Sequence, residues 1–346
     1  MSLDRRVPQD SFVYREVERL YRIAQSLRPT DVDRWNGELY ATSADTWGSL
    51  HPKTGALRLS DHRVLPHLTG STSPVNRRQQ AQALATVLHE ATHGGMETDT
   101  PTELNAVRSS HSLGLIEGFA EVRTFADFEL FTDRGGYSGL TLDTPQHPGA
   151  FAATRDLMTH VTGPVYSRGA LIDDASRGPG VMHFDQFAHA VVANRLAGMV
   201  PNREADRRAV RAALIASMIH AHWPTLPKTS AGTGESVAME VRAAVDAKVD
   251  EIRRRYRFGG SAAVGGDEPG VEVARGSVRS RHNPSRADAW ADGIDSLRFL
   301  GEQAPADGAV ARRPVLGQGA RRTGATPAHG PARATGPTRP PTRAQD

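Results

Sequence analysis

The residues with the clearest chemical potential are His89-Glu90-Ala91-Thr92-His93. On a helix of 3.6 residues per turn, His89 and His93 share a face, so both imidazoles can reach one metal ion. Glu90 projects about 100° further round, from where it can accept a proton from a water molecule at that metal. The H-E-x-x-H spacing therefore predicts a Zn²⁺ site with a catalytic carboxylate.

The flanking residues favour a helix for this motif. Ser73-Pro74 suits the start of a helix, and Gly94-Gly95 suits its end directly after the second histidine. Between them runs an apolar stripe formed by Leu84, Val87, Leu88 and Ala91. The competing interpretation is an ordinary amphipathic helix with surface histidines.

A catalytic zinc needs a third protein ligand and one open position. Glu117 is the candidate, on a helix predicted over residues 113–131 after a capping-box-like segment at 100–103. Glu121 follows four residues later on the same face, where it can orient a ligand histidine through that histidine's second nitrogen. The alternative is that both are solvated helix glutamates.

Two other residues compete with Glu117 for the third position. Asp99 follows His93 by six residues, as in the metzincin pattern, but Met96 stands where that pattern requires glycine. His111 would complete a three-histidine site, although the serines around it indicate a loop or a helix break.

With Glu117 as ligand, the chain resembles the gluzincin metallopeptidases over residues 55–175. The carrying motifs are His89-Glu90-x-x-His93, then Glu117-Gly118-Phe119-Ala120, similar to the E-G-F-A of the aminopeptidase N branch. Tyr166-Ser167-Arg168-Gly169 is similar to the Y-x-x-G of that branch, whose tyrosine stabilises the oxyanion. The resemblance implies a zincin-like fold, zinc-dependent peptide hydrolysis and this role for Tyr166. The chain has no G-x-M-E-N exopeptidase signature.

The oxyanion role of Tyr166 has alternatives in the chain. A phenol hydroxyl aimed at the developing anion would strengthen its hydrogen bond in the transition state. The tyrosine could instead be packed in the turn that follows Gly163-Pro164. His160 and His183 are further candidates for the same role.

Hydrophobic periodicity predicts an α+β domain over residues 1–258, and the resemblance implies that this domain is zincin-like. A helix at 12–27 and strands at 38–42 and 56–64 form an N-terminal part, residues 1–75. Such a sheet can bind an extended substrate along its edge strand. Helices dominate the second part, residues 76–258; beyond the two helices of the site they are expected at 149–161, 184–196, 203–221 and 235–256.

From about residue 259 the composition shifts to glycine, alanine, proline and arginine. We expect residues 259–346 to be a disordered tail, because it cannot bury enough apolar surface to fold alone. An island at 287–300 carries Trp290, Ile294, Leu297 and Leu300 at helical spacing, which indicates a short helix for a protein partner or for the domain itself.

Composition narrows the class of protein. The chain contains no cysteine, so a zinc ion would have histidine and carboxylate ligands. The net charge is +3, and the arginines of the domain are interspersed with acids, so we expect no nucleic-acid binding surface there. The basic stretch at 312–343 has two interpretations: a plain disordered tail, which we favour, and a segment that contacts nucleic acid or an acidic partner. The N-terminal residues lack an apolar signal segment, and no stretch is apolar enough to span a membrane. We expect a cytoplasmic protein.

Taken together, these residues predict a zinc metallopeptidase that acts on a peptide or protein. Its expected zinc ligands are His89, His93 and Glu117, with Glu90 as general base. Two alternatives stay open: a non-enzymatic interaction protein with structural zinc, and a zinc hydrolase of non-peptide substrates.

Overall fold

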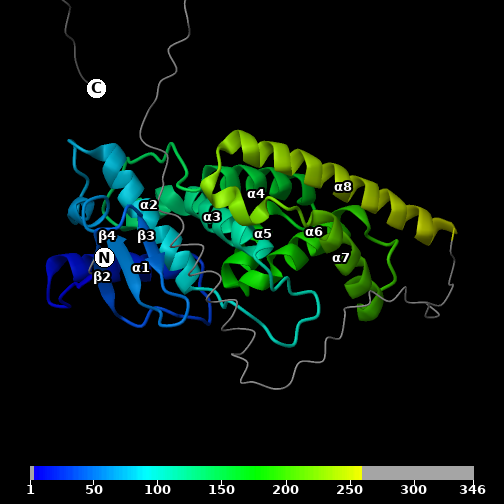
Figure 1. Ribbon diagram of the computed structural model, residues 1–346, viewed down its shortest axis with the longest axis horizontal. Coiled ribbons are helices and arrows are strands. Elements are labelled where there is room, and N and C mark those ends of the chain that lie inside the picture. The colour runs from blue at the N-terminus through cyan, green and yellow to red at the C-terminus, as the bar shows by residue number, and fades with distance from the viewer. Residues whose placement is uncertain (1–3, 259–346) are drawn as a thin grey trace, which may run out of the picture. The chain divides into compact units, whose positions relative to one another are not determined.

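The computed structural model describes residues 4–258, and Figure 1 shows the order of their elements. A small sheet and α1 (Phe12–Leu27) come first, followed by a mainly helical part. This confirms the expected α+β class with an N-terminal sheet. The predicted tail, with its helix at 287–300, lies outside the described residues.

The sheet has four short strands in the order β1-β2-β4-β3. Strand β2 pairs in parallel with β4, whereas β1 and β3 pair antiparallel to β2 and β4. Leu57 and Leu59 of β4 are buried on either side of the half-buried Arg58, as expected for a strand with one face on a core. Among residues 4–258, β3 is the last strand on one side of the sheet. The strand bounds are β1 Arg5–Arg6, β2 Leu39–Thr42, β3 Gly48–Leu50 and β4 Leu57–Ser60.

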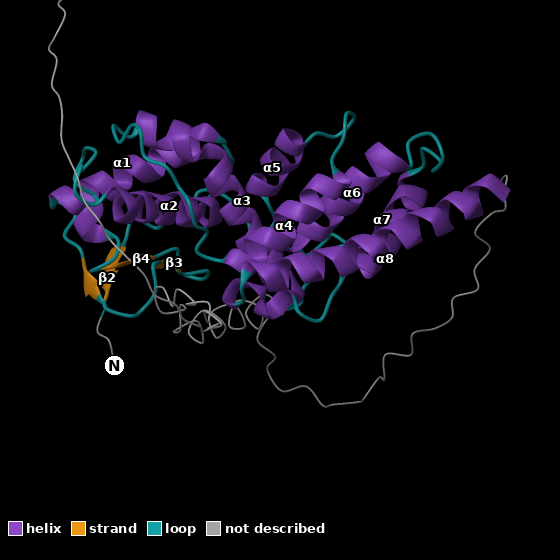
Figure 2. Cartoon of the chain, turned by 90° about the horizontal axis from the view of Figure 1, so that it is seen from above, coloured by secondary structure: helices purple, strands orange, loops and turns teal. Residues whose placement is uncertain are grey.

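The helical part begins with α2 (Arg77–Gly94) and α3 (His111–Arg134), which pack against each other. Further along the chain, α4 packs against both α3 and α8, and in Figure 2 α8 runs alongside α4 and α7. The remaining helices are α4 Pro148–Val161, α5 Arg168–Arg177, α6 His183–Arg195, α7 Glu204–Met218 and α8 Ala231–Phe258, with short 3₁₀ turns η1 Leu65–His67, η2 Gly180–Met182 and η3 Trp223–Lys228.

Two hydrophobic clusters make up the core. The sheet-side cluster joins α1, the strands, α2 and the end of α3 through residues such as Leu20, Leu59 and Leu88. The helical cluster joins the first half of α3 to the helices from α4 to α8, through residues such as Phe119 and Phe187. Helix α3 contributes to both clusters and therefore connects them.

The start of α2 differs from the prediction. The helix begins at Arg77, after Asn76, and not at Ser73-Pro74. The buried Gln80 explains the difference: its side chain accepts from Ser73 N and donates to His67 O and Ser71 O. These bonds hold residues 67–73 as a loop against the first turn of α2.

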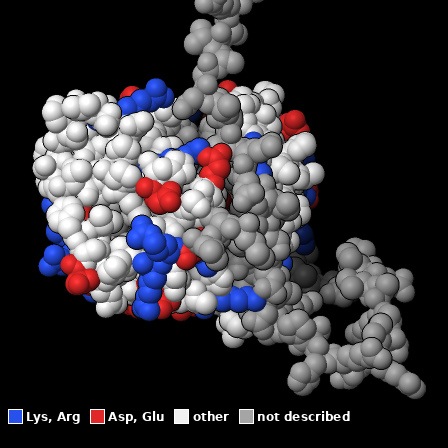
Figure 3. Space-filling model, turned by 60° about the vertical axis from the view of Figure 1, so that its left-hand side comes forward, with Lys and Arg blue, Asp and Glu red and all other residues white. Residues whose placement is uncertain are grey.

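On the face shown in Figure 3, charged side chains of both signs are scattered over the described residues, with uncharged areas between them. They do not gather into one basic patch on that face. Among the described residues, no helix combines the length and the apolar character needed to cross a membrane.

Candidate metal centre

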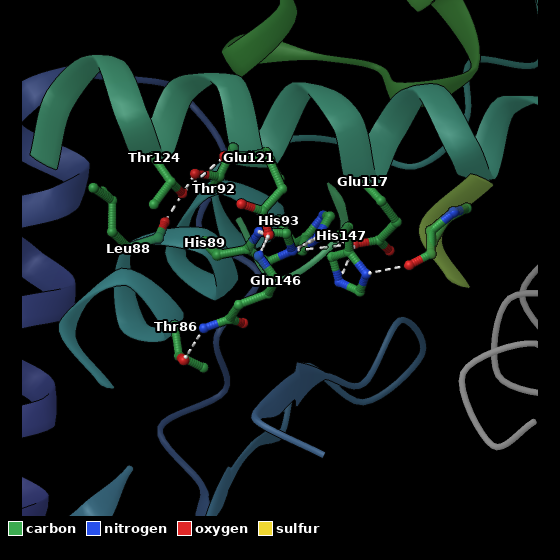
Figure 4. A network of polar contacts seen from close by, with 12 residues as sticks. Thr86, Leu88, His89, Thr92, His93, Glu117, Glu121, Thr124, Gln146 and His147 are labelled. Atoms are coloured by element: carbon green, nitrogen blue, oxygen red, sulfur yellow. Dashed lines mark hydrogen bonds and ion pairs between the residues drawn. The ribbon is translucent and has the colours of Figure 1, made fainter. Parts of the chain in front are cut away.

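Side chains of α2 and α3 meet where these helices face each other (Figure 4). His89 Nε2 lies 3.1 Å from Glu117 Oε2 and 3.1 Å from His93 Nε2. His93 Nε2 lies 3.3 Å from the same Glu117 oxygen. All three residues are buried. The structure therefore brings together the two histidines of the motif and the glutamate predicted as their partner.

The spacing of these three atoms suits a metal ion. A zinc ion about 2.0–2.1 Å from each of its tetrahedral ligands would hold them about 3.3 Å apart. The three observed separations, 3.1, 3.1 and 3.3 Å, are close to that value. Two imidazole nitrogens and a carboxylate oxygen have converging lone pairs, which a cation can satisfy together. The group could hold a metal ion.

The charge around His89 also favours a cation. Burial alone would lower the pKa of His89. The hydrogen bond with Glu117 and the charges of Glu121, Glu117 and Glu90 outweigh burial and raise this pKa to about 9. Without a metal, the His89 ring therefore carries a proton on both nitrogens at neutral pH. A metal ion at Nε2 would take the place of one of these protons.

Glu121 lies on the other side of the His89 ring, next to Nδ1. Its Oε1 is 3.5 Å from His89 Nδ1 and accepts a hydrogen bond from Gln146 N at 3.2 Å. The side chain of Gln146 donates to Thr86 Oγ1 on α2 at 2.7 Å. Glu121 thus stands where the sequence placed it, beside the second nitrogen of a candidate ligand, and it also anchors the segment before α4.

Glu90 is held by the edge of the sheet. Its Oε2 accepts a hydrogen bond from Leu50 N of β3 at 2.8 Å, and the residue is buried. Among the described residues, this is the one hydrogen bond of its carboxylate, so Oε1 is not engaged by them. The sequence did not indicate β3, because a three-residue strand that includes Gly48 has too little periodicity to be recognised.

His147 joins the centre without having been predicted. It precedes the first residue of α4, and its Nε2 lies 3.6 Å from Glu117 Oε2. Its Nδ1 lies 3.2 Å from Pro227 O. With His89 and Glu121 it forms a second group able to hold a metal ion. The helix predicted from the sequence began only at residue 149, after His147; the one available signal was a histidine directly before a helix-starting proline.

The two rival ligands lie in other contacts. Asp99 Oδ1 accepts hydrogen bonds from Arg108 Nε at 2.9 Å and Thr100 N at 2.7 Å, which stabilise the loop between α2 and α3. His111 begins α3 and its Nδ1 lies 2.9 Å from Ser109 Oγ. The predicted capping-box segment at 100–103 forms a turn, and the helix starts only at His111.

The structure does not bring Tyr166 into contact with this group. Its hydroxyl donates to Asp174, its ring packs edge-on against His189, and burial raises its pKa. His160 Nε2 lies 2.8 Å from Asp246 Oδ1. His183 is fully buried and bonds to Ala175 O at 3.1 Å. Each of the three predicted oxyanion candidates therefore has a polar atom bonded outside the three-residue group, and the buried Nδ1 of His183 has no hydrogen-bond partner among the described residues.

A pocket opens beside His93 and Glu117. Its apolar lining includes Leu50, Met96, Leu113 and Ile116, with Arg34 and Glu97 also contributing. Because Leu50 belongs to β3 and Ile116 precedes a candidate ligand, the pocket adjoins both the edge of the sheet and the metal group. The arrangement offers an apolar recess next to the candidate metal.

Comparisons of the chain with protein-family models, curated proteins and solved structures found no match.

Proposed function

We propose that the protein is a zinc-dependent metallopeptidase of the gluzincin type, built on a zincin-like domain. One observation carries the proposal: His89, His93 and Glu117 present their ligand atoms at zinc-like spacing on two packed helices. The neighbouring Glu90 has the position in the motif that a general base requires. The donor set of two imidazoles and one carboxylate is one that catalytic zinc sites use.

When bound, zinc would acidify a water molecule and polarise the scissile carbonyl. The chain's own part in the reaction falls to Glu90. Its Oε2 is fixed by Leu50 N–H, which leaves Oε1 to accept a proton from the attacking water. The same oxygen then delivers that proton to the departing amine, so the carboxylate ends the cycle in its starting state.

Peptide is the proposed substrate because, among the described residues, β3 is the outermost strand on the side of the sheet that adjoins Glu90. An extended peptide can add to a sheet edge through main-chain hydrogen bonds, with its side chains in adjoining pockets. The apolar recess beside His93 and Glu117 would take one such side chain. The oxyanion role of Tyr166 stays a prediction from the resemblance, because its hydroxyl donates to Asp174 in this conformation.

The test combines metal content with turnover. Purified protein should bind about one zinc per chain and cleave members of a diverse peptide library. Glu90→Gln keeps the side-chain shape but cannot take up a proton, so hydrolysis should fall about 10²- to 10⁴-fold with zinc retained. Glu129→Gln, the same change at an exposed site on α3, serves as the control.

The outcomes separate the proposal from its alternatives. Wild-type turnover in Glu90→Gln would overturn the mechanism. Stoichiometric zinc without cleavage of any peptide would favour a structural zinc in an interaction protein, or a hydrolase of other carbonyl compounds.

A further inference from the structure

His147 differs from a side chain that happens to lie near the centre, because the chain around it is fixed at two points. The preceding residue, Gln146, donates its backbone N–H to Glu121 and its side-chain amide to Thr86. The imidazole itself contacts Pro227 O through Nδ1 at 3.2 Å. These contacts aim the opposite nitrogen, Nε2, at Glu117 (Figure 4).

The contact with Pro227 determines where the proton of a neutral His147 ring sits. A backbone carbonyl can only accept a hydrogen bond, so Nδ1 must carry the hydrogen. Nε2 then presents a lone pair and cannot donate to an oxyanion. A metal-ligating histidine has the same pattern, with the non-ligating N–H bound to a carbonyl or carboxylate.

The distance to Glu117 also suits a ligand. His147 Nε2 lies 3.6 Å from Glu117 Oε2, within about 0.3 Å of the spacing expected between two ligands of one tetrahedral zinc. Among the described residues, His147 groups with His89 and Glu121, and His93 and Glu117 group with His89, so the imidazole must shift to reach a metal in the second of these groups. We propose that, when the metal is bound, His147 Nε2 makes this shift and becomes a fourth protein ligand of the ion held by His89, His93 and Glu117. The inference rests on the proposed function for the existence of that metal site.

A fourth protein ligand closes the position that a catalytic zinc leaves open. A centre with His147 bound to the metal is then a latent one, and hydrolysis requires His147 to leave. Of the four ligand side chains, His147 is the most exposed, at 32%, against 4% for His89, 6% for His93 and 11% for Glu117. It also precedes a helix, whereas the other three lie within helices. His147 is therefore the ligand most easily displaced.

The test uses His147→Asn, because the asparagine amide can still donate to Pro227 O while the Nε2 lone pair is lost. Zinc affinity should fall at least about tenfold, the lower bound for losing even an outer partner of a ligand. The cobalt-loaded variant should also bind acetohydroxamate, a small ligand that needs an open metal position, at least about tenfold more tightly than wild type. His62→Asn, at an exposed histidine, is the matched control.

Both changes are required. Wild-type zinc affinity in His147→Asn would show that His147 does not ligate the metal, and unchanged acetohydroxamate binding would show that it does not close the site. X-ray absorption of the zinc-loaded wild-type protein tests the same point without a variant, since the proposal requires three imidazole ligands. Two imidazoles would overturn it and leave the proposed function standing, whereas failure of the wild-type protein to bind zinc would overturn the proposed function itself.

Discussion

One imidazole is held between two carboxylates of the same helix. Glu117 and Glu121 are four residues apart on α3, and they approach opposite nitrogens of His89, Nε2 and Nδ1. The i, i+4 spacing that places side chains on one helix face thus supplies both a candidate ligand and the group that orients another ligand. The pKa of His89, raised to about 9, reflects this concentration of negative charge.

The first residue-scale prediction separates Glu117 from Asp99. Glu117→Ala should lower zinc affinity far more than Asp99→Ala, because the Asp99 carboxylate accepts hydrogen bonds from Arg108 and Thr100 within the loop between α2 and α3. Competition titration with a chromophoric chelator measures both variants. A larger loss in Asp99→Ala would mean that the metal is bound differently from the way proposed here.

Glu121→Gln tests the orienting role. The variant keeps the shape of the side chain but loses the charge that stabilises the Nδ1–H of His89, so zinc affinity should fall by about 10- to 100-fold. At saturating zinc the stoichiometry should still be one per chain. Loss of the stoichiometry itself would instead make Glu121 a direct ligand.

Because His183 is buried, we expect the free energy of unfolding to fall in acid. Burial lowers the pKa of His183 to about 4, and the charge of His93 also lowers it. The hydrogen bond to Ala175 O acts in the opposite direction but is a smaller effect than burial. Because the unfolded histidine titrates near 6.5, the unfolded chain binds more protons than the folded one between these values. Stability is therefore complete above about pH 6.5 and falls by roughly 3 kcal/mol as the pH approaches 4.

Urea unfolding of the metal-free protein across this pH range measures the effect. In His183→Gln, whose side-chain amide cannot protonate, the fall in unfolding free energy should be smaller. An equal fall in both proteins would assign the acid sensitivity to other groups. His62→Gln, at an exposed site, should behave as wild type.

At the scale of elements, the sequence predicted the helices better than the shorter elements. α1 occupies residues 12–27 as expected, because Ser11 caps it and its buried residues recur at helical spacing. The helices carrying His89 and Glu117 were also predicted. In contrast, β3 and α5 were not: three strand residues carry no usable periodicity, and the pairing of β3 with β4 is a long-range contact.

The same reasoning explains which residues of the candidate site could be predicted from the sequence. His89, Glu90 and His93 follow from the geometry of one helix, and Glu117 and Glu121 from that of a second. His147 depends on the path of a loop and on η3, which supplies Pro227 O, so no local pattern could indicate it. Tyr166 came from a short motif, and its contacts depend on α5 and α6.

Gly118, next to Glu117 on α3, lies where that helix packs closely against α4. A Cβ there would lie 2.0 Å from Thr154 Oγ1 and 2.6 Å from Ala150 O, so α3 and α4 pack too closely for any side chain. Gly118→Ala should destabilise the protein by about 1–3 kcal/mol or more, measured by urea unfolding. Gly169→Ala, where a Cβ meets nothing nearer than 3.9 Å, is the matched control. Equal stability in both variants would contradict this packing argument.

At the scale of the whole described part, the centre lies at the junction of the two hydrophobic clusters. Leu88 and Ala91, beside the candidate histidines, belong to the sheet-side cluster. Leu115 and Phe119, beside Glu117, belong to the helical cluster. A metal ion at this position would therefore link the two clusters, adding to the connection that α3 already makes. Loss of the metal should first increase local opening at the facing turns of α2 and α3.

Removal of zinc tests this linkage. Zinc at 100 times its dissociation constant should stabilise the folded protein by about 2.7 kcal/mol, so a chelator should lower the melting temperature by roughly 5–10 °C. Hydrogen exchange should accelerate mainly in the second half of α2 and the first half of α3, where the proposed ligands lie, and much less in α7 and α8. His93→Ala should show neither response, since its site no longer holds the ion. A uniform acceleration over all helices would mean that the metal supports folding of the whole domain, whereas a melting temperature independent of zinc would contradict a link between the clusters.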